Sequence, residues 1–134
     1  DRILIGSILF LFMKKHTLVI GASENPDRYS NKAVKLLVNY NHPVLAVGQK
    51  SVEIENIKIE KEISPNWKGL IDTVTLYLNP ARQKDLYKDI INLNPRRVIF
   101  NPGTENDEFE MELKSNNIAV EEACTLVLLK TGQY

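Results

Sequence analysis

The sequence contains few residues that could stabilise the chain by covalent or metal links. Its single cysteine cannot form an internal disulfide, so a reducing cytoplasmic location is expected. That cysteine and two histidines are too few soft ligands for a typical zinc site, and no bound metal is expected. Seventeen basic side chains balance seventeen acidic ones, whereas binders of nucleic acids or anionic membranes are usually basic. We therefore expect neither partner.

Long hydrophobic runs are also missing. The most apolar stretch, residues 3–13, is far shorter than the roughly 20 residues of a membrane-spanning helix. It lacks the basic flank and the cleavage site of a secretory signal. Because Met13 resembles a natural start, we interpret residues 1–12 as an upstream extension and residues 13–134 as one folded domain. A membrane anchor or an interface strand is the alternative for the extension.

Short apolar runs alternate with helical patterns along the rest of the chain. Strands are predicted at residues 17–20, 43–47, 73–78, 97–100 and 118–120, with helices after the first, third and fourth strands. A short closing helix is expected at 123–129, where a strand is the alternative. Residues 51–70 suggest a short strand or hairpin, but Pro65, Asn66 and Gly69 interrupt the pattern, so we interpret the region as irregular. The order predicts an α/β fold: a doubly wound, mainly parallel, five-stranded Rossmann-like sheet with helices on both faces.

Ligands of such folds bind beyond the carboxyl ends of the strands, where the strand order reverses. Four turn-rich loops follow these ends: residues 21–30, 48–51, 79–83 and 101–105. Three of them lead into helices, whose N-termini can hold phosphate. Ser30 and Thr104 are predicted to cap two of these helices.

The first loop, GASENPDRYS, lacks the glycine pattern G-x-G-x-x-G of dinucleotide-binding proteins. Gly21 would still let a ligand approach the backbone closely. Ser23 and Ser30 offer hydroxyl groups, and Arg28 offers a guanidinium suited to phosphate. The alternative is an ordinary turn followed by a capped helix.

The second loop, at residues 47–50, lacks the acidic residue with which NAD-binding domains hold the ribose hydroxyls. Lys50 lies there instead, which disfavours NAD and favours a nucleotide with an extra ribose phosphate, such as NADP or coenzyme A. A solvated surface lysine is the alternative. The third and fourth loops, with Asn79, Asn101 and Thr104, predict a polar pocket floor, although tight turns alone would also explain them.

No pair of nucleophile and base, or of acid and base, is recognisable in these loops. His16 and His42 precede strands, so both are expected at the opposite end of the sheet. Cys124 follows the last strand, where we expect a small buried group; pairing with a ligand thiol is the alternative.

Five segments in order, LVIGASENPDRYSNKAV, HPVLAVG, TVTLYLNP, RVIFNPGTEN and ACTLVLLKTGQ, resemble the family of stand-alone CoA-binding domains. That family has a Rossmann-like fold akin to the nucleotide-binding domain of the succinyl-CoA synthetase α subunit. The resemblance implies a cofactor site made by Gly21, Ala22, Ser23, Pro26, Arg28, Tyr29, Ser30, Gly48, Lys50, Asn79, Pro80, Arg82, Asn101, Pro102, Gly103 and Thr104.

These observations lead us to expect a non-catalytic protein that binds coenzyme A or an acyl-CoA as a carrier or sensor. One alternative is a minimal NADP-dependent oxidoreductase. Another is an interaction subunit whose nucleotide cleft is a vestige. A second copy of the chain or an enzyme is the expected partner beside the small-molecule ligand.

Overall fold

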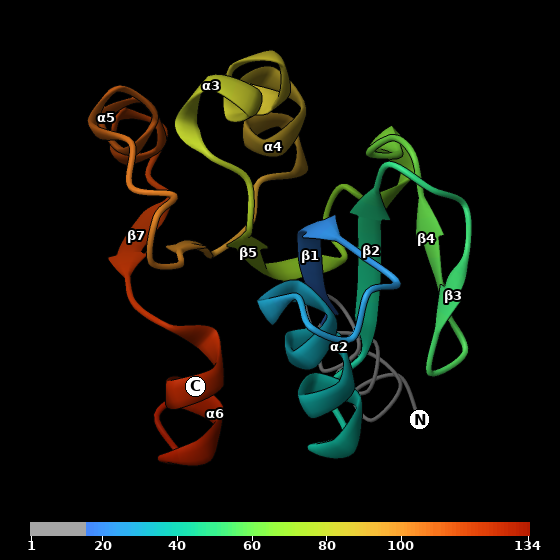
Figure 1. Cartoon of the computed structure of the whole chain (residues 1–134). Coiled ribbons are helices and arrows are strands. Elements are labelled where there is room, and N and C mark those ends of the chain that lie inside the picture. Colours follow the sequence, from blue (N-terminus) through green and yellow to red (C-terminus); the bar gives the residue numbers. More distant parts are fainter. Residues whose placement is uncertain (1–15) are drawn as a thin grey trace, which may run out of the picture.

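A seven-stranded sheet forms the middle layer of the structure (Figure 1). The computed structural model describes residues 16–134, and the predicted extension at residues 1–12 lies outside them. The strand order is β3-β4-β2-β1-β5-β6-β7, and every neighbouring pair is parallel except β3 with β4. The strands are β1 (His16–Ala22), β2 (Val44–Gly48), β3 (Glu53–Ile54), β4 (Ile57–Glu60), β5 (Ile71–Leu76), β6 (Arg97–Phe100) and β7 (Ala119–Glu122).

Helices cover both faces of the sheet, so the predicted α/β class and doubly wound arrangement are confirmed (Figure 1). On one side lie α2 (Tyr29–Asn39) and α6 (Thr125–Lys130). On the other lie α3 (Pro80–Gln83), α4 (Tyr87–Leu93) and α5 (Asp107–Ser115). Single 3-10 turns occur at Pro65–Trp67 and Lys84–Leu86. Among the helices of residues 16–134, none has the length and apolar character needed to cross a bilayer.

The core divides into two layers because side chains alternate between the two faces of each strand. Leu18 and Ile20 of β1 are fully buried in a cluster that includes Phe109 of α5. Val19, between them in the sequence, is buried in a second cluster that includes Leu37 of α2. Since both faces of β1 are covered, its sequence is continuously apolar, which is the signal that predicted a central parallel strand.

The predicted number of five strands is wrong, because residues 51–70 contain the hairpin of β3 and β4. Glu55 and Asn56 both adopt positive φ, at 49° and 66°, in the two-residue turn. Strand β4 also pairs with β2, and its Ile59 is buried. Pro65, Asn66 and Gly69, which led us to interpret the region as irregular, lie after the hairpin. The segment that contains them includes the 3-10 turn Pro65–Trp67.

Both predicted helix caps are wrong. Helix α2 begins at Tyr29, one residue before Ser30, and no side chain caps it. Helix α5 is capped by Asn106, whose Oδ1 accepts a hydrogen bond from the Phe109 amide at 3.2 Å. The Thr104 hydroxyl instead donates to the Asn101 carbonyl at 2.7 Å, inside the turn before the helix.

The carboxyl ends of β1 and β2 approach each other closely at two glycines. At Gly21 the pairing of β1 with β2 is irregular, and its φ is 90°. Ala22 then pairs with Gly48 at the end of β2. A Cβ on Gly48 would overlap the Ala22 carbonyl oxygen, so a side chain there would separate the two strands.

We expect Gly48→Ala to lower the free energy of unfolding by about 3 kcal/mol, at the upper end of the range for overpacking, because the opposing atom belongs to the backbone. Gly69→Ala is the control: Gly69 has a φ of 84° with no atom within 4 Å of the added Cβ, so only backbone strain of about 1 kcal/mol is expected. Urea denaturation of both variants measures the difference. Equal losses would contradict the close approach.

Candidate functional site

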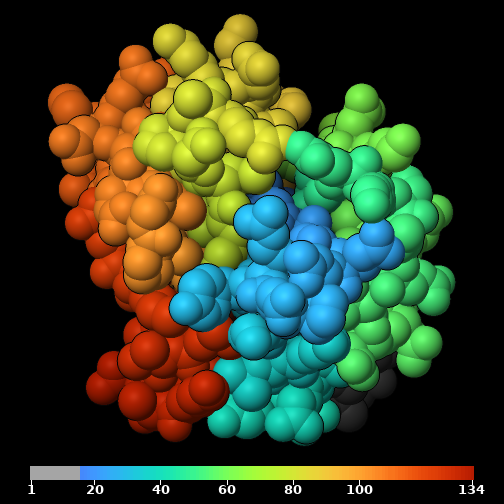
Figure 2. Space-filling model, in the orientation of Figure 1, coloured from blue at the N-terminus to red at the C-terminus, as the bar shows by residue number. Residues whose placement is uncertain are grey.

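A cleft of about 810 Å3 opens at the carboxyl end of the sheet. It lies where the strand order reverses, since β1 has β2 on one side and β5 on the other. The first loop, the segment after β2 and the loop that leads into α3 surround it. Figure 2 looks onto this end, where the surface is hollowed between the blue first loop, the yellow segment around residue 80 and the green residues near 50–60.

Most of the residues predicted for the cofactor site line this cleft. They are Gly21, Ala22, Ser23, Arg28, Tyr29, Ser30, Gly48, Lys50, Asn79, Arg82, Pro102, Gly103 and Thr104. Three others do not line it: Pro26, Pro80 and Asn101. Asn101 is 2% exposed, and both ends of its carboxamide form hydrogen bonds within the protein.

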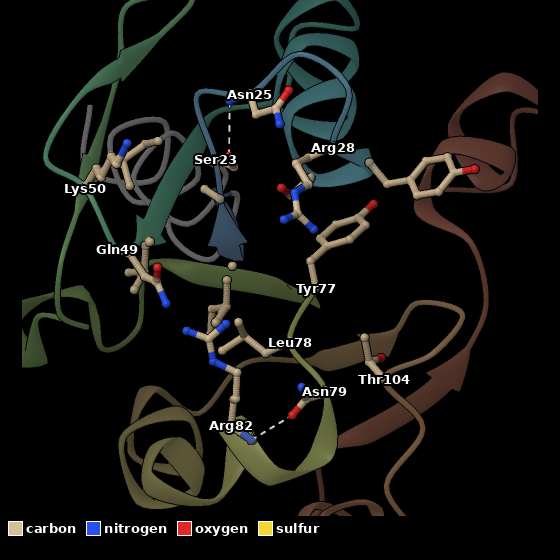
Figure 3. Close-up of a pocket in the computed structure, with 18 of the residues that line it drawn as sticks. Ser23, Asn25, Arg28, Gln49, Lys50, Tyr77, Leu78, Asn79, Arg82 and Thr104 are labelled. Carbon is tan, nitrogen blue, oxygen red and sulfur yellow. Dashed lines mark hydrogen bonds between the residues drawn. The ribbon is translucent and has the colours of Figure 1, made fainter.

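The first loop is held by its own polar side chains. Asn25 Oδ1 accepts from the Asp27 amide at 3.0 Å, and Ser23 Oγ accepts from the Asn25 amide at 3.1 Å (Figure 3). The loop delivers the chain to the N-terminus of α2, whose first turn holds no acidic residue and no side-chain cap. The leading N–H groups of this helix therefore keep their capacity for an anion at the edge of the cleft.

Gly21 is required by the fold itself. A Cβ there would come within 2.8 Å of the Tyr77 carbonyl oxygen, in a backbone conformation that side chains disfavour. The fold alone therefore explains why residue 21 is a glycine, whether or not a ligand approaches the backbone there. A larger residue at this position would damage the fold before it tested any ligand.

Positive side chains outnumber negative ones in the described lining of the cleft. Four cations line it, Arg28, Lys50, Lys61 and Arg82, against one carboxylate, Glu24. Figure 3 shows the guanidinium groups of Arg28 and Arg82 reaching into the cleft from opposite sides. Because the whole chain has no net charge, this concentration of positive charge is local. It suits a ligand with several negative charges.

Sequence reasoning missed part of the lining. Ile59 lies in β4 and Lys61 directly follows it. From the sequence we interpreted this region as irregular, and so neither residue was assigned to a strand end. The other additional residues are mostly neighbours of the predicted ones: Ile20, Glu24, Asn25, Val47, Gln49, Tyr77, Leu78 and Leu86. The apolar members offer a surface for a base or an alkyl chain.

The described residues that line the cleft include no histidine and no cysteine. Burial, followed by the nearby Cys124, raises the pKa of Tyr77 above its usual range, so its phenol stays neutral. His16 lies at the amino end of β1 and His42 just before β2, at the opposite end of the sheet as expected. Cys124 directly precedes α6, does not line the cleft and is half-buried rather than fully buried.

Three buried carboxamides hold the loops that form the cleft. Asn31 Nδ2 donates to the Ser23 carbonyl in the first loop at 2.9 Å. Asn101 Nδ2 donates to the Leu76 carbonyl at the end of β5 at 2.8 Å, and its Oδ1 accepts from the amide of Thr125 at 2.9 Å. The third, Gln83, joins two loops at once.

Gln83 has no exposed surface. Its Nε2 donates to the carbonyls of Leu78 at 2.7 Å and Thr104 at 2.8 Å, so one side chain joins the loop after β5 to the loop after β6. Its Oε1 accepts from Asn106 Nδ2 at 2.9 Å, which extends the network to the cap of α5. The sequence offered no sign of this role, because a single glutamine in a short helix resembles a surface residue.

Gln83→Leu is expected to lower the free energy of unfolding by about 1–3 kcal/mol, because leucine keeps the volume but leaves the Leu78 and Thr104 carbonyls without their donor. Gln133→Leu is the matched control at an exposed position, where a change within about 0.5 kcal/mol is expected. Chemical denaturation provides both values. A Gln83→Leu protein as stable as the control would show that the network does not hold the loops.

Known proteins resemble this chain along nearly its whole length. A family model described as CoA binding domain matches residues 15–130. A crystal structure of an uncharacterized protein is 42% identical, with a TM-score of 0.85, and the match covers 90% of this chain and 98% of that one. No curated protein matches the chain.

Two more distant structures show the same fold. A protein of Thermus thermophilus is 20% identical with a TM-score of 0.77, and the match covers 100% of this chain and 99% of that one. The dinucleotide-forming acetyl-coenzyme A synthetase 1 of Candidatus Korarchaeum cryptofilum is 17% identical with a TM-score of 0.66, and the match covers 84% of this chain and 26% of that one. At these identities the likeness concerns the fold alone.

Proposed function

The chain belongs to the family of CoA-binding domains, and from this premise we propose that its cleft binds coenzyme A or an acyl-CoA. The observation that carries the proposal is the uncapped N-terminus of α2, facing a cleft in which Arg28 and Arg82 approach from opposite sides. Oriented N–H groups and two guanidinium groups favour a diphosphate, the most charged linkage in coenzyme A.

The shape of the cleft agrees with the remaining parts of this ligand. Lys50 and Lys61 follow the neighbouring strands β2 and β4, where a ribose phosphate would lie in a doubly wound fold. Val47 and Ile59 provide apolar surface near them for an adenine ring. Leu78 and Leu86 line the wall nearer α3 and suit the aliphatic pantetheine arm.

We further propose that the protein binds its ligand without changing it. The residues that line the cleft include no histidine and no cysteine, and Tyr77 is neutral across the physiological range. Glu24 and Lys50 of the lining form an ion pair with each other. A carrier or sensor of acyl-CoA in the cytoplasm, acting together with an enzyme partner, fits this arrangement.

Arg28→Ala and Arg82→Ala should each weaken coenzyme A binding about 10- to 100-fold, the loss of a charge-assisted hydrogen bond to phosphate. Neither should alter the melting temperature, since exposed arginines contribute little to stability. Lys88→Ala, an equal loss of charge on an exposed helix position outside the cleft, is the control. Isothermal titration calorimetry measures the affinities. Arginine variants that bind as well as Lys88→Ala would refute the diphosphate site.

Incubation with acyl-CoAs, or with NADPH and a panel of carbonyl compounds, is expected to give no turnover above the uncatalysed rate, because the described cleft lining includes no histidine and no cysteine and its carboxylate is held in an ion pair. Product formation is followed by mass spectrometry. Turnover that disappears in Arg28→Ala would refute the proposal that the protein is non-catalytic. The proposal that the cleft binds coenzyme A would stand.

A further inference from the structure

Among residues 16–134, Glu24 is the one carboxylate that lines the cleft, and it is paired with one of the cations. Glu24 Oε1 lies 3.2 Å from Lys50 Nζ, so the pair links the first loop to the segment after β2. Their side chains are 48% and 74% exposed. The pair therefore lies at the mouth of the cleft, where a ligand can reach both partners.

Lys50 occupies the position after the second strand from which doubly wound folds recognise the ribose. A ligand with a phosphomonoester at the ribose brings a charge of about −1.5 to −2 near pH 7 and three acceptor oxygens to this lysine. A ligand with a hydroxyl there brings no charge. Since exposed ion pairs are weak, a phosphate can displace Glu24 from Lys50, whereas a hydroxyl leaves the pair intact.

We propose that Glu24 is a specificity-determining residue of the cleft. It occupies Lys50 until a ribose phosphomonoester displaces it, and it thereby sets how strongly the protein distinguishes phosphorylated from unphosphorylated nucleotides. This inference rests on the proposed function, because it assumes that a nucleotide enters the cleft. The rival role for Glu24 is to accept hydrogen bonds from the ribose hydroxyls, as an acid after the second strand does in NAD-binding domains.

The measured quantity is a selectivity ratio, the Kd for 3′-dephospho-CoA divided by the Kd for coenzyme A, at one fixed ionic strength. In Glu24→Gln the ratio should rise about two- to fivefold, the strength of an exposed ion pair, because Lys50 no longer has to leave a partner. In Lys50→Gln it should fall about tenfold or more, through loss of a charge-assisted contact. The double variant should match Lys50→Gln, since Glu24 acts through the lysine.

Glu60→Gln is the matched control. Glu60 forms an exposed ion pair with Lys58 at 3.7 Å, its side chain is 43% exposed, and it does not line the cleft. The ratio should be unchanged in this variant, although the net charge changes as in Glu24→Gln. A similar rise in both variants would mean a general electrostatic effect and would overturn the role of Glu24.

The remaining outcomes separate the two proposals. A parent protein that binds coenzyme A but shows the same ratio in Glu24→Gln refutes only the inference about Glu24. Weaker binding of 3′-dephospho-CoA to Glu24→Gln would establish the rival role. A parent that binds NADP instead refutes the proposed function, and the ratio of NAD to NADP affinities in the same variants then decides the role of Glu24. A parent that binds none of these nucleotides overturns both.

Discussion

Where the chain runs past the end of a strand, its backbone carbonyls no longer have partners in the neighbouring strands. The cleft depends on the side chains that supply hydrogen bonds to these carbonyls instead. The carbonyls of Ser23, Leu76, Leu78 and Thr104 lie beyond or at the last paired positions, in partly or fully buried surroundings. Buried polar groups without partners are costly, so each loop needs a donor from elsewhere. Carboxamides suit this because one NH2 group can satisfy two carbonyls, as Gln83 does, without adding charge beneath a cationic cleft.

The buried carboxamides hold the loops of the cleft, whereas the charged residues that line it are available to a ligand. Arg28 and Arg82 reach into the cleft from separate loops, and neither packs into the core. Their mutual repulsion costs little in solvent, because water and salt screen exposed charges. A polyanionic ligand would relieve this repulsion on binding. Loops held by neutral carboxamides, together with exposed guanidinium groups, allow a positive cleft in a chain with no net charge.

The sequence predicted the parts of the fold that depend on local pattern. Strands such as Arg97–Phe100 were recognisable because apolar residues fill both faces, and the carboxyl ends of four strands then located the cleft. The hairpin of β3 and β4 was suggested by the alternating pattern but set aside, because Pro65, Asn66 and Gly69 interrupt that pattern just beyond it. Lys61 was missed with it. The cap of α5 was misassigned because Thr104 and Asn106 both precede the helix, and the Thr104 hydroxyl bonds the Asn101 carbonyl instead of a helix amide. The role of Gln83 in joining the two loops could not be predicted, since its hydrogen-bond partners are 5 and 21 residues away in the sequence.

The antiparallel strand β3 has a consequence for how copies of this protein can meet. A long, regular, unpaired strand edge invites another chain to add to the sheet, and through such additions proteins aggregate. Here one edge of the sheet is β3, a strand of only two residues, Glu53–Ile54, which pairs with β4 in a tight hairpin. The opposite edge, β7, carries consecutive glutamates, Glu121 and Glu122. Within residues 16–134, both margins of the sheet thus discourage intermolecular strand addition.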